Sequence, residues 1–134
     1  MARQKKKDEK SDLDFEISFF EGVLKKRPEF IPALVALGDA YTKQGELKKG
    51  LSIDLRLSEL RQNDPIVYYN LACSYSLLGM IDDAFRVIKK AIMLGYEDFT
   101  YLRHDPDLEN LRRDRRFPHF LKDLKAYMQY EDKP

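Results

Sequence analysis

The chain has 134 residues, 43% of them hydrophobic and 35% charged, which is enough apolar material for one folded domain. Lys and Arg number 24 against 23 Asp and Glu, a balance that excludes the strongly basic surface of a general nucleic-acid binder. The single cysteine, Cys73, excludes an internal disulfide and most thiolate metal sites. No apolar stretch approaches the ~20 residues that span a bilayer, and we expect a cytoplasmic protein.

Residues 1–10 differ in composition from the rest of the chain. Their sequence, MARQKKKDEK, has no apolar stripe, and we expect a disordered basic tail. Residues 11–30 contain apolar side chains at helical spacing, namely Leu13, Ile17, Phe20 and Leu24. This segment therefore predicts one amphipathic helix, which ends near Pro28.

An internal period of 34 residues brings segment 31–64 into register with segment 65–96. Each segment begins with a helical stripe that ends at a glycine, a residue that stops a helix readily because it adopts positive φ. The matching positions are Leu34, Leu37, Tyr41 and Gly45 in one segment and Tyr68, Leu71, Tyr75 and Gly79 in the other. No stretch alternates with period two for long enough to form a strand, so the chain is predicted to be all-α.

Small residues repeat with the same period. Gly38 matches Ala72 in the first helix of each segment, and Gly50 matches Ala84 in the second. Small side chains at these positions allow two antiparallel helices to approach closely. Each segment is therefore predicted to be a pair of packed helices.

The stretches LxxLGDAYTKQG, from Leu34, and YYNLACSYSLLG, from Tyr68, resemble the first helix and turn of a tetratricopeptide repeat. The resemblance covers two full repeats, 31–64 and 65–96, and makes 11–30 a half repeat with the second helix only. Residues 97–134 resemble the degenerate unit and capping helix that close many such proteins. The family implies an α-α superhelix, a solenoid of antiparallel helix pairs. Its frequent tryptophan is replaced by Leu34 and Tyr68.

Stacked helix pairs leave a concave wall, made by the first helices, that is available to partners. The resemblance implies that this wall binds a peptide or a partner's helix. Asn70 matches a family asparagine that bonds the backbone of a bound peptide, and Tyr69 is expected to anchor the ligand. By helical phase, the groove residues are Val35, Asp39, Thr42, Lys43, Tyr69, Asn70, Cys73 and Leu77.

The sequence leaves an alternative open for these residues, in which Val35, Tyr69, Cys73 and Leu77 are core residues covered by the C-terminal helix. Some family members grip a partner's C-terminal carboxylate through basic and amide side chains. Here Pro32, Val35 and Ala36 stand where polar or basic groups would be required, so we do not expect a carboxylate clamp.

The usual catalytic and metal-binding motifs are missing from the sequence. His104 and His119 are not in an HExxH motif, no GxSxG surrounds a serine, and Cys73 is interpreted as a buried structural thiol. The basic run Arg112, Arg113, Arg115 and Arg116 lies among acidic residues and is expected to form local ion pairs. We therefore expect no enzyme, metal or cofactor, and neither a membrane nor a nucleic acid as partner.

These observations predict a non-catalytic protein–protein interaction module, an adaptor or scaffold whose partner is another protein. The alternative is a self-assembling scaffold. The half repeat lacks its first helix, so its aromatic residues are left without cover and could form a homo-oligomer face, which comprises Phe15, Phe19 and Phe20.

Overall fold

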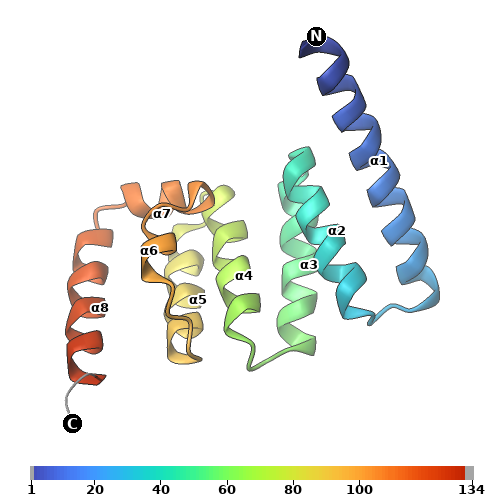
Figure 1. Ribbon diagram of the computed structural model, residues 1–134. Helices are drawn as coiled ribbons and strands as arrows, with labels where there is room; N and C mark the ends of the chain where they lie inside the picture. The colour runs from blue at the N-terminus through green and yellow to red at the C-terminus, as the bar shows by residue number, and fades with distance from the viewer. Residues whose placement is uncertain (1, 132–134) are drawn as a thin grey trace.

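The computed structural model describes residues 2–131, with side chains described for residues 8–129. Every regular element in this part of the chain is helical, and the helices form a row from α1 at one end to α8 at the other (Figure 1). Sequence neighbours pack as antiparallel pairs, so the predicted all-α superhelix of helix pairs is confirmed. The long helices are α1 (Ala2–Lys26), α2 (Ile31–Gln44), α3 (Leu47–Leu60), α4 (Pro65–Leu77), α5 (Ile81–Met93) and α8 (Phe117–Glu131).

The two predicted glycine stops end the first helix of each pair. Gly45 has φ 87° and Gly79 has φ 74°, the left-handed conformation that other residues rarely adopt. Helix α4 begins at a cap that the local sequence supplies, because the Asp64 carboxylate accepts a hydrogen bond from the Ile66 N–H at 2.9 Å and Pro65 fills the first helical position. Local sequence therefore sets the lengths of these helices.

Close helix approach explains the small residues of the repeat. A Cβ added at Gly50 would lie 3.0 Å from Thr42 Oγ1, and one added at Gly38 would lie 3.1 Å from Ile53 Cγ2. Their counterparts one period later, Ala72 and Ala84, are completely buried. The α2–α3 crossing is thus tight enough that a methyl group at either position would require a neighbouring side chain to shift.

The core runs through the whole row of helices. Ile17 on α1 packs with Leu37, Ala40 and Tyr41 on α2. A second cluster joins α2, α3 and α4, and the largest cluster joins α4 and α5 to the C-terminal unit. Its fully buried members include Ile88, Leu102, Leu108 and Leu111. Each element is therefore held by burial against its neighbours in the row.

The N-terminal segment corrects one prediction. Residues 2–10 were expected to be disordered, but they extend α1, whose N-terminal turns project beyond α2 (Figure 1). Ala, Arg, Gln, Lys and Glu are all good helix formers, and the packed part of α1 supplies the costly nucleus. Helix propagation therefore needs no apolar stripe here. Residue 1 lies outside the described residues.

The C-terminal unit replaces a regular first helix with three short ones, α6 (Phe99–Leu102), the 3-10 helix η1 (Pro106–Leu108) and α7 (Glu109–Arg113). Pro106 interrupts the helix, and Asp105 caps the next turn by accepting from the Asp107 N–H at 3.0 Å. Helix α8 then packs on α5, where Phe120 meets Phe85 at a ring distance of 5.8 Å. This unit closes the row.

Candidate partner-binding groove

A groove of about 690 Å³ lies between α2 and α4, with α3 contributing to its lining. Residues of the C-terminal unit, namely Tyr101, Asp105 and Asp107, also line it. Lys43 does not line the groove. Its ammonium instead pairs with Asp39 at 3.0 Å on the exposed surface of α2. Seven of the eight predicted groove residues do line it: Val35, Asp39, Thr42, Tyr69, Asn70, Cys73 and Leu77.

The N-terminal half of α2 gives the groove an apolar and open wall. Val35 is 48% exposed, and Ile31, Pro32 and Ala36 line the same wall. On α4, Asn70 is exposed and Leu77 is half-buried. An extended segment lying here could bury apolar side chains on Val35 and Leu77 and reach the Asn70 amide with its backbone.

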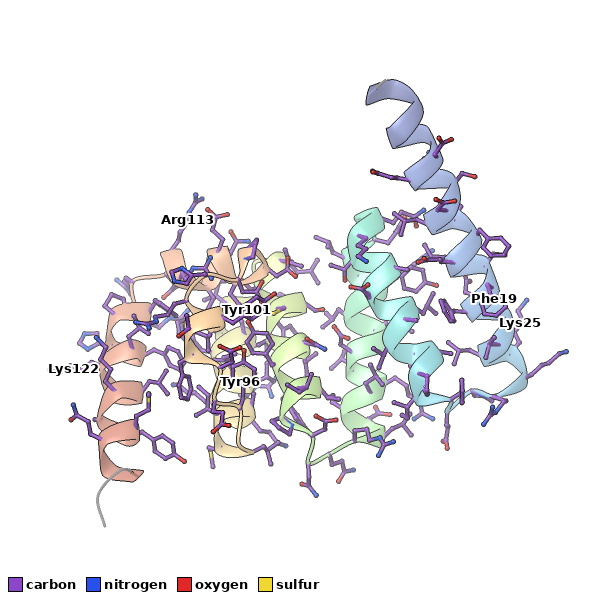
Figure 2. The ribbon with its side chains drawn as sticks, viewed as in Figure 1. Phe19, Lys25, Tyr96, Tyr101, Arg113 and Lys122 are labelled. Carbon is purple, nitrogen blue, oxygen red and sulfur yellow. The ribbon has the colours of Figure 1, made fainter. Side chains whose placement is uncertain are left out.

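Tyr69 corrects a second prediction, because its ring is buried rather than presented to a ligand. Only 4% of Tyr69 is exposed, its ring stacks on Tyr96 at 4.3 Å, and its hydroxyl donates to Asp105 at 2.6 Å. Tyr96 and Tyr101 lie in the same region, close to α4 (Figure 2). Tyr69 therefore anchors the C-terminal unit to α4.

The alternative for the groove residues is half correct. Tyr69 and Cys73 are buried core residues, but Val35 is open, and the cover comes from the segment containing Asp105. Asp105 is 3% exposed and also lies 3.7 Å from the Cys73 Sγ, which donates to it. Burial is the main cause that raises the pKa of both the Tyr69 hydroxyl and the Cys73 thiol, so both remain protonated donors.

Tyr101 is an aromatic groove residue that sequence reasoning missed. It is 52% exposed, and its ring centre lies 6.2 Å from that of Tyr69. Its position depends on how α6 folds back over α4, which the helical period cannot reveal. The Asp98 cap, which accepts from the Tyr101 N–H at 3.1 Å, marks the start of that short helix in the sequence.

Asp54 is a second residue that the sequence analysis did not place in the groove. It lies on α3, is only 9% exposed, and its Oδ2 accepts a hydrogen bond from the Ser74 hydroxyl. Burial raises its pKa to about 6, and the Ser74 hydrogen bond opposes that rise. The 34-residue shift places Asp54 on Ile88, which is completely buried. A carboxylate at a position that is apolar in the other repeat is the sequence feature that could have identified this residue.

The lining of the groove is acidic although the whole chain carries a formal charge of +1. Among the residues that the structure describes, no lysine or arginine lines it. Burial, Asp105 and Asp39 together raise the pKa of Asp107, so carboxylates from α2 and η1 influence one another across the groove. The lining contains four aspartates: Asp39, Asp54, Asp105 and Asp107.

The proposed oligomer face on α1 is only partly open. Phe15 is 71% and Phe19 54% exposed, and their rings stack at 6.4 Å; Figure 2 labels Phe19. Phe20 is half-buried and packs on the cluster between α1 and α2. Two of the three predicted residues are therefore available at the surface, and the third belongs to the core.

The basic run near the C-terminus forms local contacts, as the sequence predicts. Arg113 pairs with Glu109 at 2.7 Å, and Arg116 pairs with Asp114 at 2.8 Å and with Asp82 at 2.6 Å. The Arg112 guanidinium donates to the carbonyls of Leu102 and Asp105. Arg113 points outward from α7 in Figure 2.

Other candidate chemistry in the described part of the chain is sparse. His104 and His119 are both exposed. No group of three His, Cys, Asp or Glu side chains there is arranged to hold a metal ion. Within the same residues, no helix is both long and apolar enough to cross a membrane.

No protein-family model matches the chain. The chain is similar to a chloroplastic protein from Arabidopsis thaliana, with 42% identity over 91 residues. The matched region covers 63% of this chain and 26% of the Arabidopsis protein, so the chain spans about a quarter of that relative's length. The relative is named as a chloroplastic protein, whereas the sequence analysis predicts a cytoplasmic location.

Proposed function

We propose that this chain is a non-catalytic interaction module of the tetratricopeptide type, an adaptor that binds a segment of another protein. The groove between α2 and α4 carries this proposal, because it combines open apolar side chains with an exposed amide. The matching segments 31–64 and 65–96, each built as a helix pair with a glycine stop, support the family.

In the proposed complex, a partner segment lies along α2 and α4. Its apolar side chains cover Val35, Leu77 and Tyr101, and its backbone bonds to the Asn70 amide. Burying exposed apolar surface contributes roughly 25 cal/mol per Å² before the cost of ordering the partner is counted. The buried Tyr69 supports the groove wall and makes no direct contact.

The experiment compares affinity pull-downs from the native host, quantified by mass spectrometry. The groove variant is Val35→Asn with Asn70→Ala, two exposed positions whose substitution spares the core. The control variant is Leu55→Asn with Lys89→Ala, two exposed positions outside the groove. A partner that binds in the groove is lost from the first variant and retained by the second. Equal recovery of every partner by both would overturn the proposal.

Self-assembly is a second candidate, favoured by one observation. Phe15 and Phe19 lie in contact with each other on the outer face of α1, and both are more than half exposed. Exposed stacked aromatics on the outer face of a helix suit an interface with a second copy. This role is compatible with a groove that binds another protein.

For cellular location, two expectations compete. The sequence predicts the cytoplasm, whereas similarity to a chloroplastic relative favours the chloroplast. Fluorescence microscopy of the full-length protein tagged at its C-terminus in the native host distinguishes them.

A further inference from the structure

The charge of the groove identifies the chemistry of its occupant. Four aspartates line it without a lysine or arginine among the described lining residues, although Lys and Arg number 24 in the chain. Two cations bonded to groove residues lie outside the lining, since Lys43 pairs with Asp39 on the exposed surface and Arg112 donates to the carbonyls of Leu102 and Asp105. An acidic or anionic ligand would meet like charge here.

Asp54 supplies an observation that does not depend on the number of aspartates in the lining. Its Oδ2 is bonded to Ser74, while Oδ1 has no donor among the described residues. Every fully buried polar side-chain atom in that part of the chain has a partner, so Oδ1 keeps some contact with solvent, and Asp54 is a lining residue of the groove. A carboxylate at 9% exposure with one unpaired oxygen in the lining of a groove is a site for a donor from a ligand.

Asp107 and Asp39 extend this acceptor set toward the surface. Asp107 on η1 is half-buried and has no salt-bridge partner among the described residues. Asp39 on α2 has Lys43, but both side chains are 64% exposed, and such pairs are weak. An incoming cation can therefore compete for Asp39 at little cost.

Apolar side chains border these carboxylates. Val35 and Leu57 line the groove together with Asp54, so a long basic side chain could lay its methylene stem on them and extend its cation to the floor. Lysine and arginine are the residues with this combination of apolar stem and charged end.

Resting on the proposed function of the groove, we infer that its occupant is a basic peptide segment of another protein. Its lysine or arginine side chains meet Asp54, Asp39 and Asp107, and its apolar side chains cover Val35 and Leu77.

The first test selects peptides from a phage-displayed random library, with peptides of about twelve residues, a length that spans a groove of this class. The baits are wild type, Asp39→Asn with Asp107→Asn, and the groove variant Val35→Asn with Asn70→Ala. We expect wild type to enrich peptides with more Lys and Arg than Asp and Glu. The double asparagine variant should lose this excess.

The second test measures affinity by fluorescence anisotropy with one enriched peptide and its version with Gln at each Lys and Arg. We expect about tenfold weaker binding of the basic peptide to Asp39→Asn with Asp107→Asn, and a further loss with Asp54→Asn. Raising NaCl from about 50 to about 300 mM should weaken binding of the basic peptide and leave binding of the Gln version nearly unchanged.

Glu59→Gln with Asp83→Asn is the control, because it removes as much negative charge as Asp39→Asn with Asp107→Asn. Neither of the two control residues lines the groove. This variant should bind the basic peptide within about twofold of wild type, because it removes the same net charge and the two ion pairs that it breaks, Arg56–Glu59 and Arg86–Asp83, lie outside the groove. Circular dichroism and urea unfolding confirm that each variant is folded.

The outcomes separate the inference from the proposal on which it rests. Groove-dependent peptides without a basic excess would overturn the inference and leave the groove as a binding site. If no enriched peptide depends on Val35 and Asn70, the binding site itself is wrong, and the inference fails with it.

Discussion

At Asp54 the first repeat places a carboxylate where the second repeat has an apolar residue. Its counterpart Ile88 is fully buried and apolar, whereas Asp54 places a carboxylate beside Ser74 in the lining of the groove. Removing a carboxylate from water disfavours its charged form, so this choice costs stability at neutral pH. A site that meets a cationic ligand would offset that cost on binding.

The pH dependence of stability tests this account. In the unfolded chain Asp54 titrates near 3.8, and in the folded chain its pKa is raised to about 6. Between these values only the folded state keeps the proton, so stability falls as pH rises and about 3 kcal/mol is lost by neutral pH.

Asp54→Asn removes the titration and keeps an oxygen that accepts from Ser74. We expect the free energy of unfolding of the variant to exceed that of wild type by about 2 kcal/mol at about pH 8 and to equal it near pH 4. Urea unfolding measures both values. Identical pH profiles for the two proteins would contradict the buried, ionised carboxylate.

Tyr69 provides a second prediction at this scale. Its hydroxyl donates to the buried Asp105, whereas Tyr101 is half exposed and its hydroxyl has no hydrogen bond among the described residues. Tyr69→Phe should therefore lower the free energy of unfolding by about 1–2 kcal/mol, because a buried acceptor loses one of its donors. Tyr101→Phe, the matched control, should change it by less than about 0.5 kcal/mol. Equal effects in urea unfolding would show that the Tyr69 bond adds nothing.

At the scale of the helix, the contact between Thr42 and Gly50 is one of the two tightest points of the α2–α3 crossing that involve a glycine. Thr42 Oγ1 donates to the Gly38 carbonyl at 3.0 Å, which fixes the hydroxyl where it would meet a Cβ at Gly50. Helix propensity and packing therefore oppose each other at residue 50. Alanine is favoured by about 1 kcal/mol over glycine in a helix, but the contact at 3.0 Å removes that gain.

A double-mutant cycle separates the two effects. Gly50→Ala in the wild-type background should give no gain in stability, whereas in a Thr42→Ala background it should add about 1 kcal/mol. Gly22→Ala on α1, where an added Cβ would meet nothing within 4 Å, is the propensity control and should also add about 1 kcal/mol. Chemical denaturation of the set gives the coupling energy. A gain from Gly50→Ala of the same size in both backgrounds would rule out the steric account.

For the molecule as a whole, the two ends of the row differ. Helix α8 buries Phe117, Phe120 and Leu124 on the C-terminal core, while α1 leaves Phe15 and Phe19 on its outer face. Exposed stacked aromatic rings form an apolar patch that suits an interface. We therefore expect the outer face of α1 to be the surface on which a second copy docks.

Sedimentation equilibrium tests this expectation. Across about 5 to about 500 µM, wild type should show a mass that rises from monomer toward dimer, because association follows mass action. Phe15→Lys with Phe19→Lys should stay monomeric over the same range. Replacing Tyr127, an exposed aromatic on α8, by Lys serves as the control at the opposite end and should associate like wild type. A wild-type monomer throughout would eliminate the assembly role.

Much of this architecture could be predicted from local sequence. Comparing the chain with itself reveals the 34-residue period. The stops at Gly45 and Gly79 and the Asp64 cap depend on contacts within a few residues, so the local sequence reveals them too. The same helical phase placed seven of the eight residues in the lining of the groove, since side chains three and four apart on a helix share a face, but it did not reveal that Tyr69 and Cys73 are buried there.

What the local pattern could not decide depends on segments far apart in the chain. Tyr69 is buried because Asp105, 36 residues later, folds over α4, and no helical period encodes that contact. Asp54 joins the groove only because α3 packs behind α2 and α4 and brings Ser74 to it. Residues 2–10 are helical because the packed part of α1 nucleates them. Periodicity reports which face of a helix is apolar, but only tertiary packing decides what covers that face and where charge is left open.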